Sequence, residues 1–194
     1  MLRDAVQFLL DVLVQSFAAV LLLRFHLQWL RAPMRNPIGE LVMALTDFAV
    51  LRVRRHIPPF RGLDSASVVL ACAVESLYLA ATIWLQGFPV VGFALLGVPV
   101  WALVGLLKLS IYLLMGALIM EALLSWINPH SPIAPLLAAI SRPFVAPLRR
   151  RIPPLGNVDL TFFLLIIICQ LTLMLPVAAL ENFVLRQLWY ERVV

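Results

Sequence analysis

The stretch Ala102–Trp126, ALVGLLKLSIYLLMGALIMEALLSW, decides the fold class of this chain. Its only charged residues are Lys108 and Glu121, and the other side chains are apolar or uncharged. A helix of about 20 apolar residues crosses the hydrocarbon core of a bilayer, which is roughly 30 Å thick. The stretch therefore predicts a transmembrane helix.

The composition of the whole chain agrees with a membrane protein. Of its 194 residues, 63% are hydrophobic and 13% are charged, whereas a soluble domain has roughly 45–50% apolar and about 25% charged residues. The mean hydropathy is +1.00. Three further apolar segments are long enough to cross a bilayer, at residues 5–29, 66–85 and 160–180. We therefore expect an all-α membrane protein with four transmembrane helices.

The arginines predict the orientation of these helices. The chain has 14 arginines and one lysine, and ten of the arginines lie in the loop after the first apolar segment or in the loop after the third. Basic residues in short loops stay on the cytoplasmic side of a membrane. We therefore expect both arginine-rich loops in the cytoplasm and both termini on the opposite side. The net charge of +5 then indicates orientation and attraction to anionic lipid, and it does not suggest nucleic-acid binding.

The connection between the second and third apolar segments, residues 87–101, is itself apolar and rich in glycine and proline. An additional crossing here would place one of the two arginine-rich loops on the outer side of the membrane. We therefore predict that residues 87–101 form an interfacial or re-entrant segment and not a fifth span.

The chain contains an internal repeat. Over residues 37–64, 11 of 28 positions are identical to the positions 95 residues further on. Each half is predicted to contain a span, an arginine-rich cytoplasmic loop and a second span, and both halves run in the same direction across the membrane. The expected boundaries are residues 1–86 for the first repeat, 87–101 for the linker, 102–182 for the second repeat and 183–194 for a C-terminal tail.

Each loop begins with a helix start signal, Asn36-Pro37 in the first and Ser131-Pro132 in the second. Apolar residues follow at helical spacing, so each loop is predicted to carry a short amphipathic helix that lies in the membrane interface. Pro143 and Pro147 are expected to break the second of these helices.

In both loops, arginines stand just before a Pro-Pro pair. Guanidinium groups bind phosphate with two hydrogen bonds and are attracted to an anionic leaflet. These arginines either only orient the chain or form a surface for lipid headgroups or a partner protein. The aspartates that follow are expected to cap the returning helices and to pair with the arginines. The candidate binding residues are Arg54, Arg55, Pro58, Pro59, Asp64, Arg149, Arg150, Arg151, Pro153, Pro154 and Asp159.

Five charged residues lie within the predicted spans: Asp11, Arg24, Glu75, Lys108 and Glu121. A charge near the membrane centre costs roughly 2.5–3.5 kcal/mol on insertion scales, so each should have a partner. The repeat aligns Asp11 with Lys108 and Arg24 with Glu121, which predicts ion pairing between the first and third spans. Glu75 would pair with Lys108 or Arg24. The other interpretation of the five charges is an ion or proton pathway.

The stretch Ser141–Asp159, SRPFVAPLRRRIPPLGNVD, resembles the repeated motif of the YggT family, which is called YlmG in Gram-positive bacteria and cyanobacteria. A degenerate first copy covers residues 46–67. The resemblance extends over nearly the whole chain and implies a multi-pass protein of the bacterial inner membrane with periplasmic termini and no known catalytic activity. Relatives are linked to cell division or nucleoid distribution, to osmotic stress and potassium uptake, and in plastids to cytochrome maturation.

The sequence contains no motif that would indicate an enzyme, such as a phosphate-binding glycine loop or a nucleophile elbow. Two cysteines in apolar runs and three scattered histidines predict neither a metal site nor a cofactor. We therefore expect a non-catalytic scaffold or assembly factor. It would organise a membrane or cytoplasmic protein partner, or anionic lipid, at the cytoplasmic face, and it is compatible with a homo-oligomer. The alternative is a small oligomeric ion channel or transport component.

Overall fold

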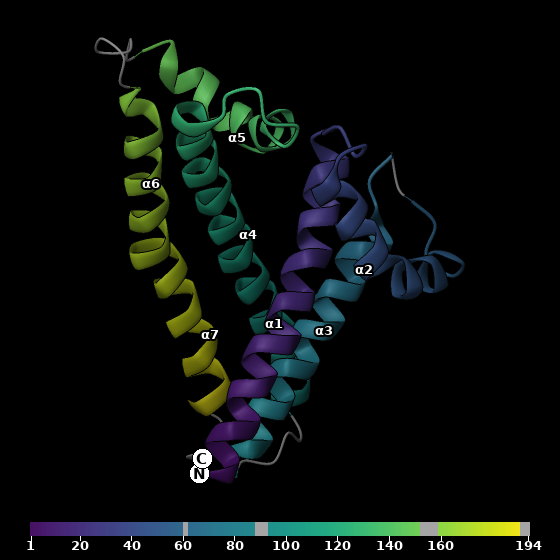
Figure 1. Cartoon of the computed structure of the whole chain (residues 1–194). Coiled ribbons are helices and arrows are strands. Elements are labelled where there is room, and N and C mark those ends of the chain that lie inside the picture. The colour runs from purple at the N-terminus through teal and green to yellow at the C-terminus, as the bar shows by residue number, and fades with distance from the viewer. Residues whose placement is uncertain (60–61, 88–92, 152–158, 191–194) are drawn as a thin grey trace.

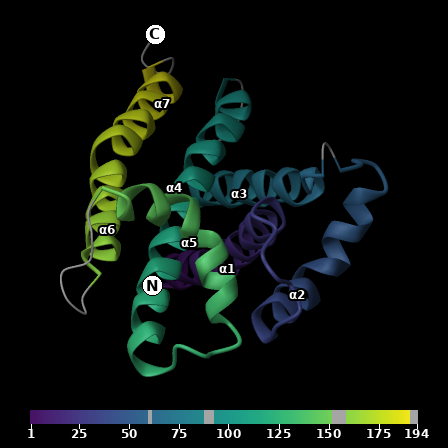
Figure 2. The same cartoon turned by 90° about the horizontal axis from the view of Figure 1, so that it is seen from above.

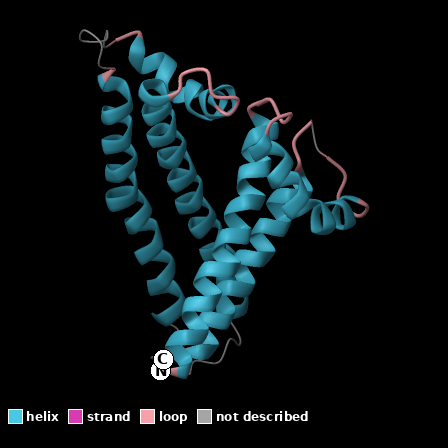
Figure 3. Cartoon of the chain, in the orientation of Figure 1, coloured by secondary structure: helices cyan, strands magenta, loops and turns pink. Residues whose placement is uncertain are grey.

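The computed structural model describes residues 1–59, 62–87, 93–151 and 159–190. Among these residues there are helices and no strand (Figure 3). The elements are α1 (Leu2–Trp29), α2 (Pro37–Arg54), α3 (Ser65–Leu85), α4 (Phe93–Ile127), α5 (Ala134–Arg149), α6 (Leu160–Thr172), the π-helical turn η1 (Leu173–Val177) and α7 (Ala178–Tyr190). Four helical runs have the length and hydropathy of a membrane span: α1, α3, α4 and the run from α6 into α7. The prediction of an all-α fold with four such helices is confirmed.

The long helices diverge from the end of the molecule that carries both termini (Figure 1). Helix α1 packs along α3, both contact α4, and α4 contacts the α6–α7 run on its other side. Leu21 and Leu22 of α1 share a buried cluster with Ala66 and Ala71 of α3, and Val50 of α2 and Leu106 of α4 belong to the same cluster. The small alanine side chains let α1 and α3 approach closely, which is how helices gain packing energy in a membrane.

The short helices α2 and α5 both lie at the end of the molecule opposite the termini (Figures 1 and 2). Each follows a long helix and precedes another, so the order of long, short and long helix occurs twice along the chain. Helix α5 is held by a second buried cluster, in which Leu136, Leu137 and Ile140 meet Leu27 of α1 and Ala117 of α4. This cluster fixes α5 across the tops of α1 and α4.

The start signals of the two short helices differ in outcome. The Asn36 side chain accepts a hydrogen bond of 3.0 Å from the Gly39 backbone N–H and caps α2, as expected. Helix α5 begins only at Ala134, and the expected start at Ser131 is wrong. Pro143 and Pro147 were expected to break α5, yet the helix continues through both to Arg149. Prolines bend a helix whose buried face holds it in place, and α5 changes direction along its course (Figure 2).

Two predicted boundaries are wrong because helices extend beyond them. Residues 93–101 form the first turns of α4 and not a separate interfacial or re-entrant segment, and Pro99 lies within the helix. Residues 88–92 lie outside the described residues. At 1.5 Å per residue, the 35 residues of α4 span about 52 Å, so the helix must tilt or extend beyond a 30 Å hydrocarbon core.

The fourth span also continues past its expected end. Residues 183–190, predicted as part of a tail, belong to α7. Pro176 interrupts the run only by the π-helical turn η1, because a wider turn relieves the clash between the proline ring and the preceding carbonyl group. This extension adds Glu181 to the last span, so the spans contain a further acidic residue.

Candidate functional site

Arg24 of α1 is the centre of a buried charge cluster in the first half of the chain. Its side chain is 3% exposed. Its Nη1 atom donates to Thr46 Oγ1 at 2.7 Å and to Asp47 Oδ1 at 2.6 Å, both on α2. Its Nε atom lies 3.3 Å from Asp64 Oδ2. One guanidinium group thus joins α1 to α2 and to the start of α3.

Asp64 is almost completely buried and receives several donors on one oxygen. Arg54 Nη2 lies 2.8 Å from Asp64 Oδ2, and the Ser67 hydroxyl donates to the same oxygen at 2.7 Å. The expected pairing with a loop arginine is therefore present. The expected capping is wrong, because the Asp64 side chain accepts no backbone N–H of α3. The two arginines and Ser67 all lie at Oδ2, and the buried Oδ1 has no hydrogen-bond partner among the described residues.

The second half has charges of the opposite sign at the matching positions. Glu121 of α4 accepts a hydrogen bond from the hydroxyl of Ser141, which stands 95 residues after Thr46. Arg142, 95 residues after Asp47, is exposed. Within the part of the chain that the structure describes, no ion pair joins Glu121 to Arg142. Glu121 and Arg142 are therefore present in the second half without forming an ion pair with each other.

Arg149 and Asp159 form the ion pair that corresponds to Arg54 and Asp64. Arg149 Nε donates to Asp159 Oδ2 at 2.8 Å, and Nη2 donates to the same oxygen. The Thr161 backbone N–H donates to Asp159 Oδ1 at 3.0 Å, so Asp159 caps α6 as expected. Partial burial of Asp159 opposes ionisation, but the interactions with Thr161 and with the Arg149 charge outweigh it, so the pKa of Asp159 is lowered.

Two adjacent cavities open between α4 and α5. One has a volume of about 510 Å³ and is lined by Glu121, Ser141 and three arginines, with small apolar side chains between them. The arginines are Arg142, Arg149 and Arg150. The other, of about 520 Å³, extends from Glu121 and Ala138 toward His130 and Ser131. Glu121 lies where the two cavities meet.

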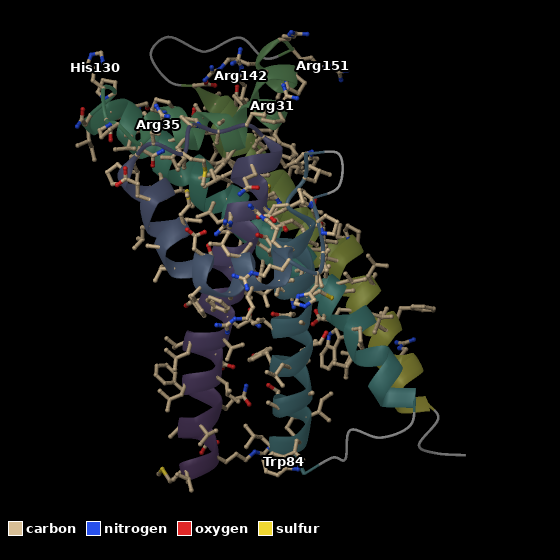
Figure 4. All side chains as sticks on the ribbon, turned by 90° about the vertical axis from the view of Figure 1, so that its right-hand side faces the viewer. Arg31, Arg35, Trp84, His130, Arg142 and Arg151 are labelled. Carbon is tan, nitrogen blue, oxygen red and sulfur yellow. The ribbon has the colours of Figure 1, made fainter. Side chains whose placement is uncertain are left out.

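The remaining candidate binding residues lie on the surface. Arg55, Arg150 and Arg151 are exposed, as are Pro58 and Pro59. Pro153 and Pro154 lie outside the described residues. Figure 4 shows Arg31, Arg35, Arg142 and Arg151 at one end of the molecule and Trp84 near the other. Four loop arginines therefore lie together at one end of the bundle.

A third cavity, of about 280 Å³, lies among α1, α3, α4 and α7 at the level of the spans. Lys108 of α4 pairs there with Glu181 of α7, with Nζ–Oε distances of 2.9 and 3.0 Å. Glu75 of α3 is 3% exposed and accepts a hydrogen bond of 3.2 Å from Gln15. A Cβ atom on Gly105 would lie only 2.5 Å from Glu75 Oε1, so the glycine makes room for this carboxylate.

The predicted ion pairs between the first and third spans are wrong. Lys108 pairs with Glu181, whereas Asp11 accepts hydrogen bonds from Tyr78 at 2.8 Å and from Gln7 at 2.7 Å. Arg24 and Glu121 each bind groups on the short helix that follows, as described above. Sequence reasoning missed Glu181 because it ended the fourth span at residue 180. The apolar residues of the next helical turn, 183–185, are the signal that could have found it.

Among the described residues, no group of three or more histidine, cysteine, aspartate or glutamate side chains could hold a metal ion. The chemistry available in the structure is therefore that of arginines, carboxylates and hydroxyls. These groups bind ions and headgroups by hydrogen bonds and charge.

The fold, with four apolar helices of membrane-crossing length, is that of a multi-pass membrane protein. The family model described as CCB3/YggT matches residues 4–86 and 100–180, one stretch in each half. The chain belongs to the CCB3/YggT family, so the predicted resemblance is confirmed.

Curated relatives align with most of this chain. An uncharacterized protein of Pseudomonas aeruginosa is 32% identical, over 82% of both chains. The uncharacterized protein YggT of Escherichia coli is 29% identical, over 96% of this chain and 98% of the relative. A third, from Vibrio alginolyticus, is 31% identical, over 84% of this chain and 89% of the relative. No solved structure matches the chain.

Proposed function

We propose that the protein is a non-catalytic scaffold or assembly factor of the bacterial inner membrane, built from two repeats. Its arginine-rich end faces the cytoplasm, where it binds anionic lipid headgroups and holds partner membrane proteins. The termini lie in the periplasm. The positive-inside rule supports this orientation, because four loop arginines, Arg31, Arg35, Arg142 and Arg151, lie at one end. The equivalent pairs Arg54–Asp64 and Arg149–Asp159 support the repeat.

The observation that carries the proposal is the exposed face of α2. Leu41, Leu45 and Phe48 are exposed and follow one another at helical spacing. Arg52 and Arg55 continue the same face at the C-terminal end of the helix and are also exposed. An apolar face that ends in arginines is typical of a helix lying in the membrane interface, with its apolar side in lipid and its guanidinium groups at the phosphates.

Lipid selectivity tests the first part of this proposal. The full chain is reconstituted in bilayers, and the association of spin-labelled phosphatidylglycerol is compared with that of phosphatidylcholine. We expect the anionic lipid to be preferred and the preference to fall by at least about twofold in Arg52→Gln/Arg55→Gln. The control is Arg3→Gln, because Arg3 lies at the N-terminal end of α1 and α2 follows the other end. Equal association of both lipids in the unmodified chain would contradict the proposal.

Crosslinking mass spectrometry in native membranes tests the scaffold role. We expect a defined set of membrane-protein crosslinks to the α2 and α5 end, lost in Phe48→Glu and kept in Phe8→Glu, which changes an exposed phenylalanine of α1 far from that end. The same crosslinks in both variants would mean that this end of the molecule does not hold the partners.

The second candidate function is an ion pathway, and the third cavity favours it. Its lining combines Glu75, Gln15 and the Lys108–Glu181 pair at the level of the spans. A charge held inside a membrane is a functional candidate by default. Flux measurements in liposomes test this function: potassium or proton movement that is abolished by Glu75→Gln would favour the pathway over the scaffold.

A further inference from the structure

A cavity of about 510 Å³ lies between α4 and α5, and the matching groups of the first half are arranged differently. There, Arg24 fills the space between α1 and α2 and is neutralised by Asp47 and Asp64. In the second half, Glu121 is hydrogen-bonded among the described residues only to Ser141, and a cavity remains beside it.

The lining of this cavity has two chemical sides. Ala138, Arg142, Ala146 and Arg149 follow one another on one face of α5, and Arg150 lies beside them. Arg149 is neutralised by Asp159, whereas Arg142 and Arg150 are exposed and, within the described residues, belong to no ion pair. These two guanidinium groups are donors for a phosphate group.

Glu121 supplies the opposite charge in the same cavity. One of its carboxylate oxygens accepts the Ser141 hydroxyl, and the group as a whole is only half-buried. A carboxylate with a remaining free oxygen binds a primary ammonium group by a charge-assisted hydrogen bond. The cavity therefore offers a site for a ligand that carries both a phosphate and an ammonium group.

The depth of Glu121 points to a lipid as the source of this ligand. Glu121 lies six residues before the end of α4 at Ile127, about 9 Å along the helix axis. The exposed apolar side chains Ile119, Met120 and Leu123 lie on other faces of α4 at this depth, so lipid acyl chains contact the helix at the level of Glu121.

We propose that the α4–α5 cavity binds the headgroup of a phospholipid that joins a phosphate to a primary amine, as phosphatidylethanolamine does. Arg142 and Arg150 hold the phosphate, and Glu121 accepts hydrogen bonds from the ammonium group. The inference rests on the proposed function only in placing this end of the bundle at headgroup level.

Lipid titration of the purified full chain, followed by native mass spectrometry, tests the site. We expect phosphatidylethanolamine to bind about tenfold more tightly than phosphatidylcholine, because a trimethylated ammonium has no N–H to donate to Glu121. Glu121→Gln should abolish this preference and still bind both lipids. Arg142→Gln/Arg150→Gln should lose binding of both. The control is Arg3→Gln/Arg186→Gln, which changes two exposed arginines that do not line the cavity and should leave the preference unchanged.

Each other outcome overturns the proposal. Equal binding of phosphatidylethanolamine and phosphatidylcholine by the unmodified chain would contradict an ammonium site at Glu121. An unchanged preference in Glu121→Gln would contradict it as well. Because Arg142 and Arg150 are exposed, their double variant keeps the fold and reports on the phosphate side even if Glu121→Gln fails to fold. Soluble phosphoethanolamine that competes as well as the lipid would show a free metabolite as the ligand. Loss of the phosphatidylglycerol preference in Arg52→Gln/Arg55→Gln concerns the proposed function and not this site.

Discussion

Arg24 in the first half of the chain is paired with carboxylates, whereas Glu121, its equivalent in the second half, belongs to no ion pair among the described residues. Arg24 and Asp47 meet in the first half at 2.6 Å. Glu121 and Arg142 stand at the matching places of the second half with the signs exchanged, and they line a cavity without forming a pair. Similar helix arrangements can thus contain either a closed ion pair or an accessible cavity, depending on which helix has the longer side chain.

Side-chain length and donor number explain the difference. A guanidinium group has five N–H donors in a planar arrangement, so Arg24 reaches from α1 to acceptors on α2 and to Asp64 before α3. A glutamate on α4 is shorter and can only accept, so Glu121 stops at Ser141. Arg142, on the surface of α5, reaches solvent more easily than it reaches back to α4.

The largest expected effect comes from opening the closed half. Arg24→Met removes the guanidinium group between Asp47 and the buried Asp64, and leaving a buried charge without its partner costs about 3–5 kcal/mol. Unfolding of the detergent-solubilised protein, followed by circular dichroism, measures the loss. Glu121→Gln is the matched control and should cost about 1 kcal/mol or less. Equal losses of unfolding free energy in Arg24→Met and Glu121→Gln would show that Arg24 and Glu121 do not differ in how strongly they stabilise the fold.

The contact between the halves gives the next largest effect. Gly105→Ala places a Cβ atom against Glu75 of α3, which should destabilise the protein by about 1–3 kcal/mol through overpacking. In a Glu75→Ala background the same change should be nearly neutral, because the clashing carboxylate is gone. A double-mutant cycle on unfolding free energies measures this coupling, and simple additivity would argue against the contact.

Exchanging the charges of the open half tests whether it can be closed. Glu121→Arg alone adds a cation beside Arg142, and Arg142→Asp alone adds a carboxylate beside Glu121, so both single variants should be destabilised. The double variant copies the arrangement of Arg24 and Asp47, and we expect a favourable coupling of about 1–2 kcal/mol in the cycle. The absence of coupling would mean that backbone spacing, not charge placement, keeps this half open.

The smallest effect concerns pH. Because the pKa of Asp159 lies below its ordinary value of 3.8, its pair with Arg149 stabilises the folded state at higher pH. That stability is lost as the pH falls through the lowered pKa. Both side chains are partly exposed, so salt screening limits the loss to about 0.5–1 kcal/mol. Asp159→Asn should flatten this part of the pH profile of the melting temperature, whereas an unchanged profile would assign the acid sensitivity to another group.

Much of the fold could be predicted from the sequence, because apolar runs of membrane-crossing length have few alternatives. The runs predicted at residues 5–29 and 66–85 become α1 (Leu2–Trp29) and α3 (Ser65–Leu85), close to their predicted bounds. Boundaries failed where prolines occur in apolar surroundings. Pro99, Pro143 and Pro176 all lie inside helical runs, because packing and lipid support helices that would end in water.

The candidate site was only partly predictable. The repeat identified the arginine–aspartate pairs of both loops, since the two residues of each pair are close in sequence. It also aligned Arg24 with Glu121, and this suggested that they pair with each other. Their real partners are Thr46, Asp47 and Asp64 for Arg24, and Ser141 for Glu121. Equivalence in a repeat specifies depth in the membrane and says nothing about which helix lies within reach.

The sequence by itself determined that this chain crosses a membrane, because the apolar runs and the clustered arginines are local properties that partition each segment between lipid and water. It also placed five charges within the spans, although it missed Glu181. Only the tertiary structure decided how those charges are satisfied, as in the Lys108–Glu181 pair and the cavity beside Glu121. The physical reason is that an ion pair acts over a few ångströms, and helix packing sets that distance between residues far apart in the chain.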